Sequence, residues 1–210
     1  RKMYQPSHFQ EQRIPVMHDL MRAHPFATLI SNGSDGLSAD HIPLLVHDDG
    51  SECGVLRGHI AKANPLTKNI DLSGDVLAAF QGPHHYITPA WYPSKKEHGK
   101  VVPTWNYAIV HAHGSIRFIE DANWLLDQVT SLTSQQEAGQ EQPWAVSDAP
   151  TNYIELMLKA IISLEIPINR LHGKWKVSQN RPEADQEGVA QGLKDKATTP
   201  ALQLADLSPD

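Results

Sequence analysis

Residues 55–65 read VLRGHIAKANP and join the end of a strand to the start of a helix. The first six of them are mostly apolar and predict a strand, in which Gly58 marks a point where another group approaches the backbone closely. Asn64 followed by Pro65 predicts a helix start, because the Asn side chain can cap free N–H groups and Pro fits the first helical position. The N-terminus of a helix favours a bound anion.

Two cations flank this junction, Arg57 on the strand and Lys62 just after it. The planar guanidinium of Arg matches phosphate oxygens and Lys adds a mobile point charge, so the stretch predicts a phosphate site. His59 lies between them and either donates to that phosphate or bonds a neighbouring carbonyl. The alternative is an edge strand whose basic side chains are merely solvated.

The composition predicts an ordinary globular chain that works in a reducing compartment. Its 210 residues, 40% of them apolar, suffice for one domain with a full core or for two small domains. No apolar run approaches the roughly 18 residues that a membrane span needs. The single cysteine, Cys53, rules out a disulfide within the chain, so we expect a cytoplasmic protein.

The net charge of −6 is concentrated at one end of the chain. Residues 183–210 hold six acidic residues and two lysines and so carry −4, which leaves −2 for the remainder. A nearly neutral body argues against a broad basic face for nucleic acid. We expect a folded domain over residues 3–181 and an acidic, partly mobile tail over 182–210, with a short helix near 200–207.

Strand patterns outnumber helix patterns along the chain. Strands are expected at residues 26–31, 37–46, 52–60, 76–81, 86–92, 104–119 and 161–168, with 170–177 as an irregular segment or a last strand. Helices are expected at residues 15–24, 66–72, 121–136 and 151–160. Turn signals at Asn32-Gly33 and Asp35-Gly36 and at residues 48–50 predict that the first three strands are antiparallel neighbours.

This order of elements is typical of an α+β domain, mainly β, with a barrel-like antiparallel sheet and inserted helices. Six or seven strands are expected, and Gly114 is expected to bend the longest of them. The chain lacks a GxGxxG fingerprint and regular βαβ alternation, which excludes a doubly wound sheet.

A second unusual stretch, VPTWNY at residues 102–107, opens the longest predicted strand. Alternation along the strand places Thr104 and Asn106 on one face and Trp105 on the other. A hydroxyl and an amide can bond a heteroaromatic edge that carries donors and acceptors, and an indole can stack on such a ring. The alternative is a well-packed strand start in which Trp105 fills the core.

The chain shows no self-sufficient catalytic or metal motif. His111 and His113 share a strand face, as two metal ligands would, but no third ligand has matching spacing, and we expect no metal site. HExxH and CxxC are absent, as is a nucleophile elbow. An enzyme with this sequence would need a cofactor to carry the chemistry.

Direct reading of DNA is not supported by the sequence. A helix-turn-helix needs two short helices joined by a tight turn, the second of them basic and exposed. The predicted helices are separated by strands or long loops, and the one at residues 121–136 contains no Lys or Arg.

Seven blocks of the chain together resemble the PaiB-like family of FMN-binding negative transcriptional regulators. They are MYQPSHF at 3–9, PFATLIS at 25–31, HIPLLV at 41–46, GHIAKANP at 58–65, YITPAWY at 86–92, VPTWNY at 102–107 and LHGKWKVSQNR at 171–181. The resemblance runs from Met3 to about Leu193. It implies a split β-barrel with peripheral helices, of the kind found in pyridoxamine-phosphate-oxidase-like flavoproteins, which are usually homodimers with two flavin sites at the interface.

The same resemblance implies an FMN site made of three groups of residues. They are Arg57 and Lys62 for the phosphate, with His59 and Asn64 as helpers, then Thr104, Trp105 and Asn106 for the flavin ring, and Lys174, Trp175 and Gln179 closing over the site from the partner chain. The residues that the resemblance assigns to the phosphate agree with the phosphate site predicted from the pattern at residues 55–65.

The leading interpretation is a homodimeric FMN-binding regulator that acts indirectly, because no DNA-reading element is evident. The alternative is a flavin-dependent oxidoreductase, either a small-molecule reductase or a haem-degrading type, which the twelve histidines keep open. A third interpretation is a barrel that has lost its cofactor and works only as an interaction module.

Overall fold

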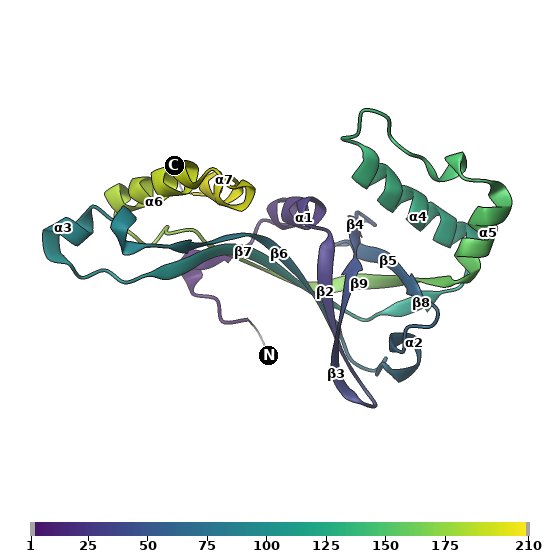
Figure 1. Cartoon of the computed structure of the whole chain (residues 1–210). Helices are drawn as coiled ribbons and strands as arrows, with labels where there is room; N and C mark the ends of the chain where they lie inside the picture. The colour runs from purple at the N-terminus through teal and green to yellow at the C-terminus, as the bar shows by residue number, and fades with distance from the viewer. Residues whose placement is uncertain (1–2, 209–210) are drawn as a thin grey trace. The chain divides into compact units, whose positions relative to one another are not determined.

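The computed structural model describes residues 3–208, in which strands and helices occupy similar shares of the chain (Figure 1). The strands are β1 Gln10–Glu11, β2 Phe26–Gly33, β3 Gly36–Pro43, β4 Leu45–His47, β5 Val55–Ala61, β6 Val76–Ile87, β7 Thr104–Gly114, β8 Arg117–Ile119 and β9 Ile161–Lys176. The α-helices are α1 Ile14–Ala23, α2 Leu66–Asn69, α3 Ser94–His98, α4 Ala122–Glu137, α5 Thr151–Lys159, α6 Glu183–Lys196 and α7 Thr199–Ala205. Short 3₁₀ helices are η1 Ser7–Phe9, η2 Pro89–Trp91 and η3 Val146–Asp148.

The strands form one sheet in the order β3-β2-β6-β7-β9-β5-β4, and β1 and β8 also pair with β9. The pairs β2–β3, β2–β6, β4–β5, β5–β9 and β8–β9 are all antiparallel. Among residues 3–208 this order has two free ends, so the sheet is not closed. The α+β class predicted from the sequence is confirmed, with nine strands where six or seven were expected.

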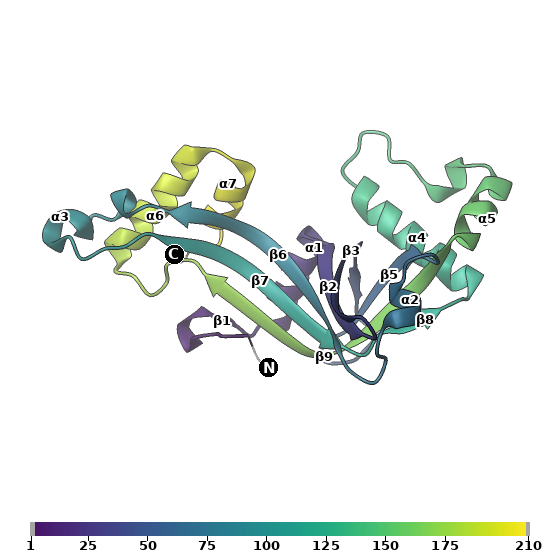
Figure 2. The same ribbon diagram turned by 60° about the horizontal axis from the view of Figure 1, so that its bottom comes forward.

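The chain divides into two compact units. The first unit consists of residues 3–23, 81–110 and 172–208, and the second of residues 24–80 and 111–171. Strands β6, β7 and β9 each have segments in both units, and Figure 2 shows them as three long neighbouring strands. The single folded domain expected over residues 3–181 stays a prediction.

In the second unit, the hairpin expected from the first turn signals is present. β2 and β3 pair through a two-residue turn between Gly33 and Gly36. At Leu44 the chain leaves this ladder, the N–H of Leu44 donates to Pro25 O at 2.9 Å, and β4 then pairs with β5. The single strand expected over residues 37–46, and with it the three-stranded meander, is therefore wrong.

Gly58 in β5 has the close neighbour that the sequence anticipated. A Cβ at this position would lie 2.7 Å from Leu44 Cδ2 and 3.0 Å from Pro43 O. Glycine therefore lets the segment before β4 pack against β5.

Two strands are longer than the predicted segments with which they begin. β6 runs through Gly82 and Pro83, which predict a break, and β9 joins residues 161–168 to the basic segment after them. Of the strand predicted at residues 86–92, only the first two residues belong to β6, because Pro89–Trp91 form η2. β6 pairs with β2 only over Leu77–Ala79, so β2 does not extend to Pro83. Because proline has no N–H to donate, its presence there removes no hydrogen bond to β2.

The longest strand is β9. The single strand expected over residues 104–119 is wrong, because β7 ends at Gly114 and a separate strand, β8, begins at Arg117.

The helices agree with the sequence in position more than in length. α1, α4 and α5 lie within two residues of their predicted bounds, and Asp121 caps α4 by accepting from Trp124 N–H at 2.7 Å. α2 has four residues instead of seven, and α3 forms in a segment for which neither a helix nor a strand was predicted. No helix within residues 3–208 is long and apolar enough to cross a membrane.

Residues 183–205 form two helices that pack on each other in the first unit (Figure 1). α7 confirms the short helix expected near residues 200–207, whereas α6 was not anticipated. Leu193 and Leu204 are fully buried in a cluster with Ile87 and Tyr92. The mobility of the tail stays a prediction, and its residues 209–210 lie outside the described part of the chain.

Candidate functional site

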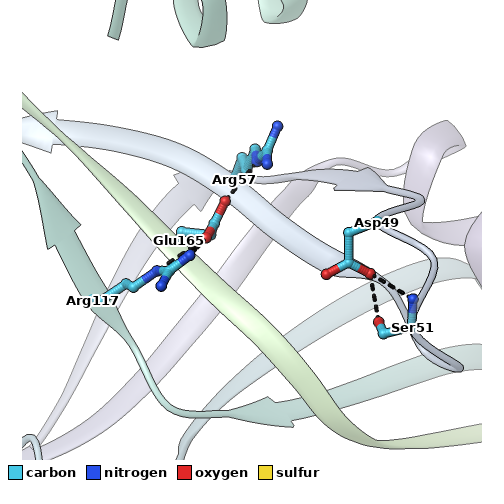
Figure 3. A network of polar contacts seen from close by, with 5 residues as sticks. All are labelled: Asp49, Ser51, Arg57, Arg117 and Glu165. Atoms are coloured by element: carbon cyan, nitrogen blue, oxygen red, sulfur yellow. Dashed lines mark hydrogen bonds and ion pairs between the residues drawn. The ribbon is translucent and has the colours of Figure 1, made fainter. Parts of the chain in front are cut away.

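Arg57, Glu165 and Arg117 lie side by side on three paired strands of the second unit. β9 runs between β5 and β8, and the register places Arg57 and Arg117 both opposite Glu165. Arg57 Nε donates to Glu165 Oε2 at 2.7 Å, and Arg117 donates to Oε1 through Nε at 3.0 Å and through Nη2. The two guanidinium groups reach the carboxylate from opposite sides (Figure 3). One carboxylate thus orients two cations, and Asp49 also interacts electrostatically with Arg57.

The carboxylate of Glu165 is buried, whereas its partners reach solvent. The side chain of Glu165 is 4% exposed, and that of Arg57 is 34% exposed. Burial acts to raise the pKa of Glu165, but the hydrogen bonds from Arg117 and Arg57 outweigh it and hold the pKa below its usual range. The Nη atoms of Arg57 form no hydrogen bond to residues 3–208, so they can donate to an oxyanion.

Helix α4 covers the same face of β5 with Trp124 and Gln128, one helical turn apart. Arg57 Cζ lies 5.3 Å from the centroid of the Trp124 ring, a cation–π contact. His59 Nδ1 donates to Gln128 Oε1 at 2.7 Å. Gln128 Nε2 and Ser163 Oγ are buried with no hydrogen-bond partner among the described residues, so this face keeps polar groups that a ligand can satisfy.

Lys62 and Asn64 have other surroundings. Lys62 lines a cavity of about 240 Å³ whose lining includes Leu125 and Leu158 but not Arg57. Asn64 Oδ1 accepts from Leu66 N–H at 2.9 Å, which confirms the predicted helix start. The helix that follows has only four residues, too few for the anion site expected at its N-terminus. A joint role of Arg57 and Lys62 stays a prediction.

In the first unit, β7 presents Trp105 and Asn106 on opposite faces, as the alternation predicts. Trp105 is 48% exposed, its ring lies 5.9 Å from that of His84, and its Nε1 donates to His84 Nδ1 at 3.2 Å. Asn106 is 1% exposed and donates to Ser178 Oγ at 2.8 Å, while its Oδ1 has no partner among the described residues. The alternative in which Trp105 fills the core is therefore wrong.

Two lysines of β9 contact the residues around this stretch. Lys176 donates to Thr104 Oγ1 and to Trp105 O, the latter at 2.9 Å. Lys174 is 7% exposed, and its ammonium group donates to Tyr4 O at 3.0 Å. Thr104, predicted as a ring contact, thus already accepts a hydrogen bond from a cation.

Trp175 and Gln179 are engaged within their own chain. Trp175 is buried at the end of β9. Gln179 Oε1 accepts from Val177 N–H at 2.8 Å, and its Nε2 donates to Trp175 O at 2.5 Å. Their expected contact with the cofactor of a partner chain stays a prediction.

Each unit, taken by itself, offers side chains whose chemistry suits one part of FMN. Arg57 offers two terminal nitrogens to a phosphate, and the buried Asn106 Oδ1 can accept from an N–H group on the edge of a flavin ring. The exposed indole of Trp105 can pack against the ring. Residues 3–208 contain no group of three or more His, Cys, Asp or Glu side chains placed to hold a metal ion.

Glu165 and Arg117 were missed by the sequence reasoning, as were Lys176 and Arg181. Glu165 interrupts the apolar run IISLEIPI, and a carboxylate buried in a strand needs a cationic partner, so this signal was available. Arg117 could not be assigned, because its pairing depends on the register of β8 on β9.

The family comparison covers most of the chain. Residues 3–170 match the family described as "Putative FMN-binding domain". An uncharacterized protein of Emericella nidulans is 37% identical over 240 residues, which span 98% of this chain and 96% of that protein. The "Protease synthase and sporulation protein PAI 2" of Bacillus subtilis is 29% identical over 208 residues, 99% of this chain and 97% of that protein.

Among solved structures, the FAD and heme binding protein from Mycobacterium smegmatis has a similar fold. The TM-score is 0.59 at 16% identity, and the match covers 87% of this chain and 80% of that chain. Together with the open antiparallel sheet, this similarity confirms the split β-barrel with peripheral helices that the sequence predicted.

Proposed function

Because the chain belongs to the family described as "Putative FMN-binding domain", whose members are PaiB-like, we propose that it is an FMN-dependent negative regulator that works as a homodimer. FMN is the cofactor that this membership gives. When bound, FMN supplies a ring that takes up and releases electrons. The protein's own residues bind and orient the cofactor.

One observation carries the binding proposal: Arg57 presents a guanidinium whose orientation is fixed by a buried carboxylate and whose terminal nitrogens are unused. A guanidinium group whose orientation is already fixed loses less side-chain entropy on binding a phosphate than a freely moving guanidinium group does. His59, two residues further along β5, and Lys62 and Asn64, which follow the strand, assist in binding FMN.

The ring contacts come from the first unit. Thr104 and Asn106 bond the edge of the ring, and Trp105 packs against it. We infer that Lys174, Trp175 and Gln179 close over the cofactor from the partner chain.

A homodimer is supported by apolar surface that the single chain leaves exposed. Trp105 and Tyr86 are 48% and 44% exposed and lie edge to face, with ring centroids 6.2 Å apart. Clusters of exposed rings of this kind mark interfaces. Light scattering of the purified protein should give twice the mass of one chain, and a monomer at micromolar concentration would contradict the dimer.

Regulation is proposed to be indirect. The long helix α4 carries no Lys or Arg, and the chain has a net charge of −6, which disfavours duplex DNA as the direct partner. Occupancy or redox state of FMN then shifts an interaction with another protein in the cytoplasm. A salt-dependent, sequence-specific gel shift by the purified protein alone would contradict this part of the proposal.

The spectrum of the purified protein tests cofactor binding. Protein reconstituted with FMN and passed through a desalting column should keep a flavin absorbance, and mass spectrometry of the denatured sample should find FMN. Protein that stays colourless after reconstitution would favour an interaction module that has lost its cofactor.

A further inference from the structure

Lys174, Lys176 and Arg181 form a group of three cations in the first unit. Lys174 and Lys176 lie two residues apart on β9 and so share a face of the strand. The turn after β9 brings Arg181 back, because its N–H donates to Ser178 O at 2.9 Å. Ser178 adopts a left-handed conformation with φ 70, which is rare for a residue other than glycine.

The three cations affect one another electrostatically. Burial, followed by repulsion from Lys174 and Arg181, lowers the pKa of Lys176 from its usual range. Like charges held this close cost free energy unless an anion lies between them.

No anion of the described residues takes that place. Among residues 3–208, no Asp or Glu forms an ion pair with any of the three cations. The two buried carboxylates of the first unit are bonded elsewhere, Glu11 to Arg13 and Asp185 to Ser94. The partners of the three cations are carbonyl and hydroxyl oxygens and aromatic faces. Those contacts join Lys174 to Tyr4 and Tyr107, Lys176 to Thr104 and Trp105, and Arg181 to Tyr92.

The cations are held in fixed positions rather than dispersed in solvent. Lys174 is only 7% exposed, an unusual place for a lysine without a carboxylate. Aromatic faces and backbone oxygens fix the side chains but do not neutralise them, since a carbonyl carries only a partial charge. Lys176 and Arg181 are partly exposed, and a partly buried, prearranged group of cations is the arrangement that oxyanion sites use.

We propose that Lys174, Lys176 and Arg181 bind an oxyanion, the phosphate or carboxylate group of a small molecule, next to Thr104 and Trp105. This site shares no residue with Arg57, His59, Lys62 or Asn64, so it does not depend on the phosphate role proposed for Arg57. The oxyanion belongs either to FMN itself or to a second ligand that lies beside the flavin ring.

The test uses the full-length, flavin-free chain. Inorganic phosphate is the probe, and its binding is measured by calorimetric titration at constant ionic strength. Chloride serves as the reference anion. The wild type should bind phosphate saturably. The double variant Lys176→Gln with Arg181→Gln should weaken binding by about a hundredfold, roughly tenfold for each charge-assisted hydrogen bond that the variant cannot form. The matched control is Lys95→Gln with Lys96→Gln, two exposed lysines of α3 in the same unit, and it should bind like the wild type.

Phosphate binding no stronger than chloride binding, or equal weakening in the double variant and in the control, would overturn the site. Should the double variant fail to fold, Arg181→Gln alone carries the test, and Lys176→Arg should retain binding because it keeps the charge.

Repeating the titration with FMN-loaded protein distinguishes the two sources of the oxyanion. If phosphate binding is unchanged, the natural ligand is a second molecule. If FMN blocks phosphate, and the double variant loses affinity for FMN but not for riboflavin, the occupant is the FMN phosphate. Either result supports the site. A chain that binds no FMN at all would contradict the proposed function, but the titration of flavin-free protein with phosphate would still decide this inference.

Discussion

Glu165 holds two arginines that the sequence places sixty residues apart. Because its side chain is almost fully buried, the carboxylate has been removed from water and depends on Arg57 and Arg117 for compensation. Removing it would leave two guanidinium groups without a counter-charge on β5 and β8, the two strands that flank β9 at this point. The residue therefore contributes to stability and to the orientation of the proposed phosphate contact at once.

The variant Glu165→Gln should lower the free energy of unfolding at neutral pH by roughly 3 kcal/mol, because two cations lose their counter-charge. The pKa of Glu165 is lower in the folded chain than its usual 4.5, so its contribution is complete above about pH 4.5 and is lost as the pH falls through the folded pKa. The gap between wild type and variant should therefore be full at neutral pH and shrink in acid.

Urea denaturation at pH 7 and at about pH 3.5 measures this gap. Glu155→Gln, which changes an exposed glutamate of α5, is the matched control and should shift stability by less than about 0.5 kcal/mol. A gap of the same size at both pH values would show that Glu165 is not the charged centre of this network.

At the scale of elements, Gly114 is where β7 gives way to β8. A Cβ there would lie 2.0 Å from Pro167 O in β9, closer than any real contact, and the obstacle is backbone rather than a flexible side chain. Gly114→Ala should cost at least about 1–3 kcal/mol. Gly139→Ala, in the loop after α4 with open space around the added Cβ, should leave the urea midpoint almost unchanged. Equal midpoints for the two variants would contradict the close approach of β9.

The helices α6 and α7 provide a second matched pair. Leu204 is fully buried in the cluster with Tyr92 and Leu193, whereas Leu202 is 41% exposed. Leu204→Ala should destabilise the chain by about 2–5 kcal/mol and Leu202→Ala by less than about 1 kcal/mol, as measured by thermal or urea unfolding. If Leu204→Ala left the stability of the chain unchanged, these residues would behave as the mobile tail that their composition predicts.

The sequence predicted elements well where the local signal agrees with the tertiary structure. Asp121 caps α4 and Asn64 caps α2 as expected, since capping depends only on nearby residues. The break predicted at Gly82 and Pro83 is absent, because whether a proline interrupts a strand depends on which neighbouring strands pair with it there. Likewise, the acidic composition after Pro182 concealed Leu193, whose burial needs residues a hundred positions earlier in the chain.

For the candidate site, the sequence located Arg57 correctly on a strand but could not supply its partner. The pairing with Glu165 joins residues 108 positions apart and follows from the register of β5 on β9. The same limit applies to Lys176, whose contact with Thr104 depends on which strands lie side by side. The spacing of residues predicts which side chains share a face of one strand or helix. Which strands are neighbours, and hence which side chains meet across strands, can be read only from the order of strands in the sheet.

At the scale of the whole molecule, the cations that the fold arranges occur in small groups matched to single oxyanions. One group is Arg57 with Arg117 around Glu165, and the other is Lys174 with Lys176 and Arg181. The net charge of −6 disfavours binding to the polyanionic backbone of DNA. This pattern favours a small anionic cofactor or ligand over nucleic acid as the direct partner.

The central claim is that this chain binds FMN through a phosphate contact at Arg57, and paired titrations of the full chain with FMN and with phosphate-free riboflavin test it most directly. Arg57→Ala should raise the Kd for FMN about ten- to a hundredfold and leave the Kd for riboflavin unchanged, while the exposed Lys68→Ala control behaves like the wild type. Equal reductions of affinity for FMN and riboflavin, or no reduction for either, would contradict the claim.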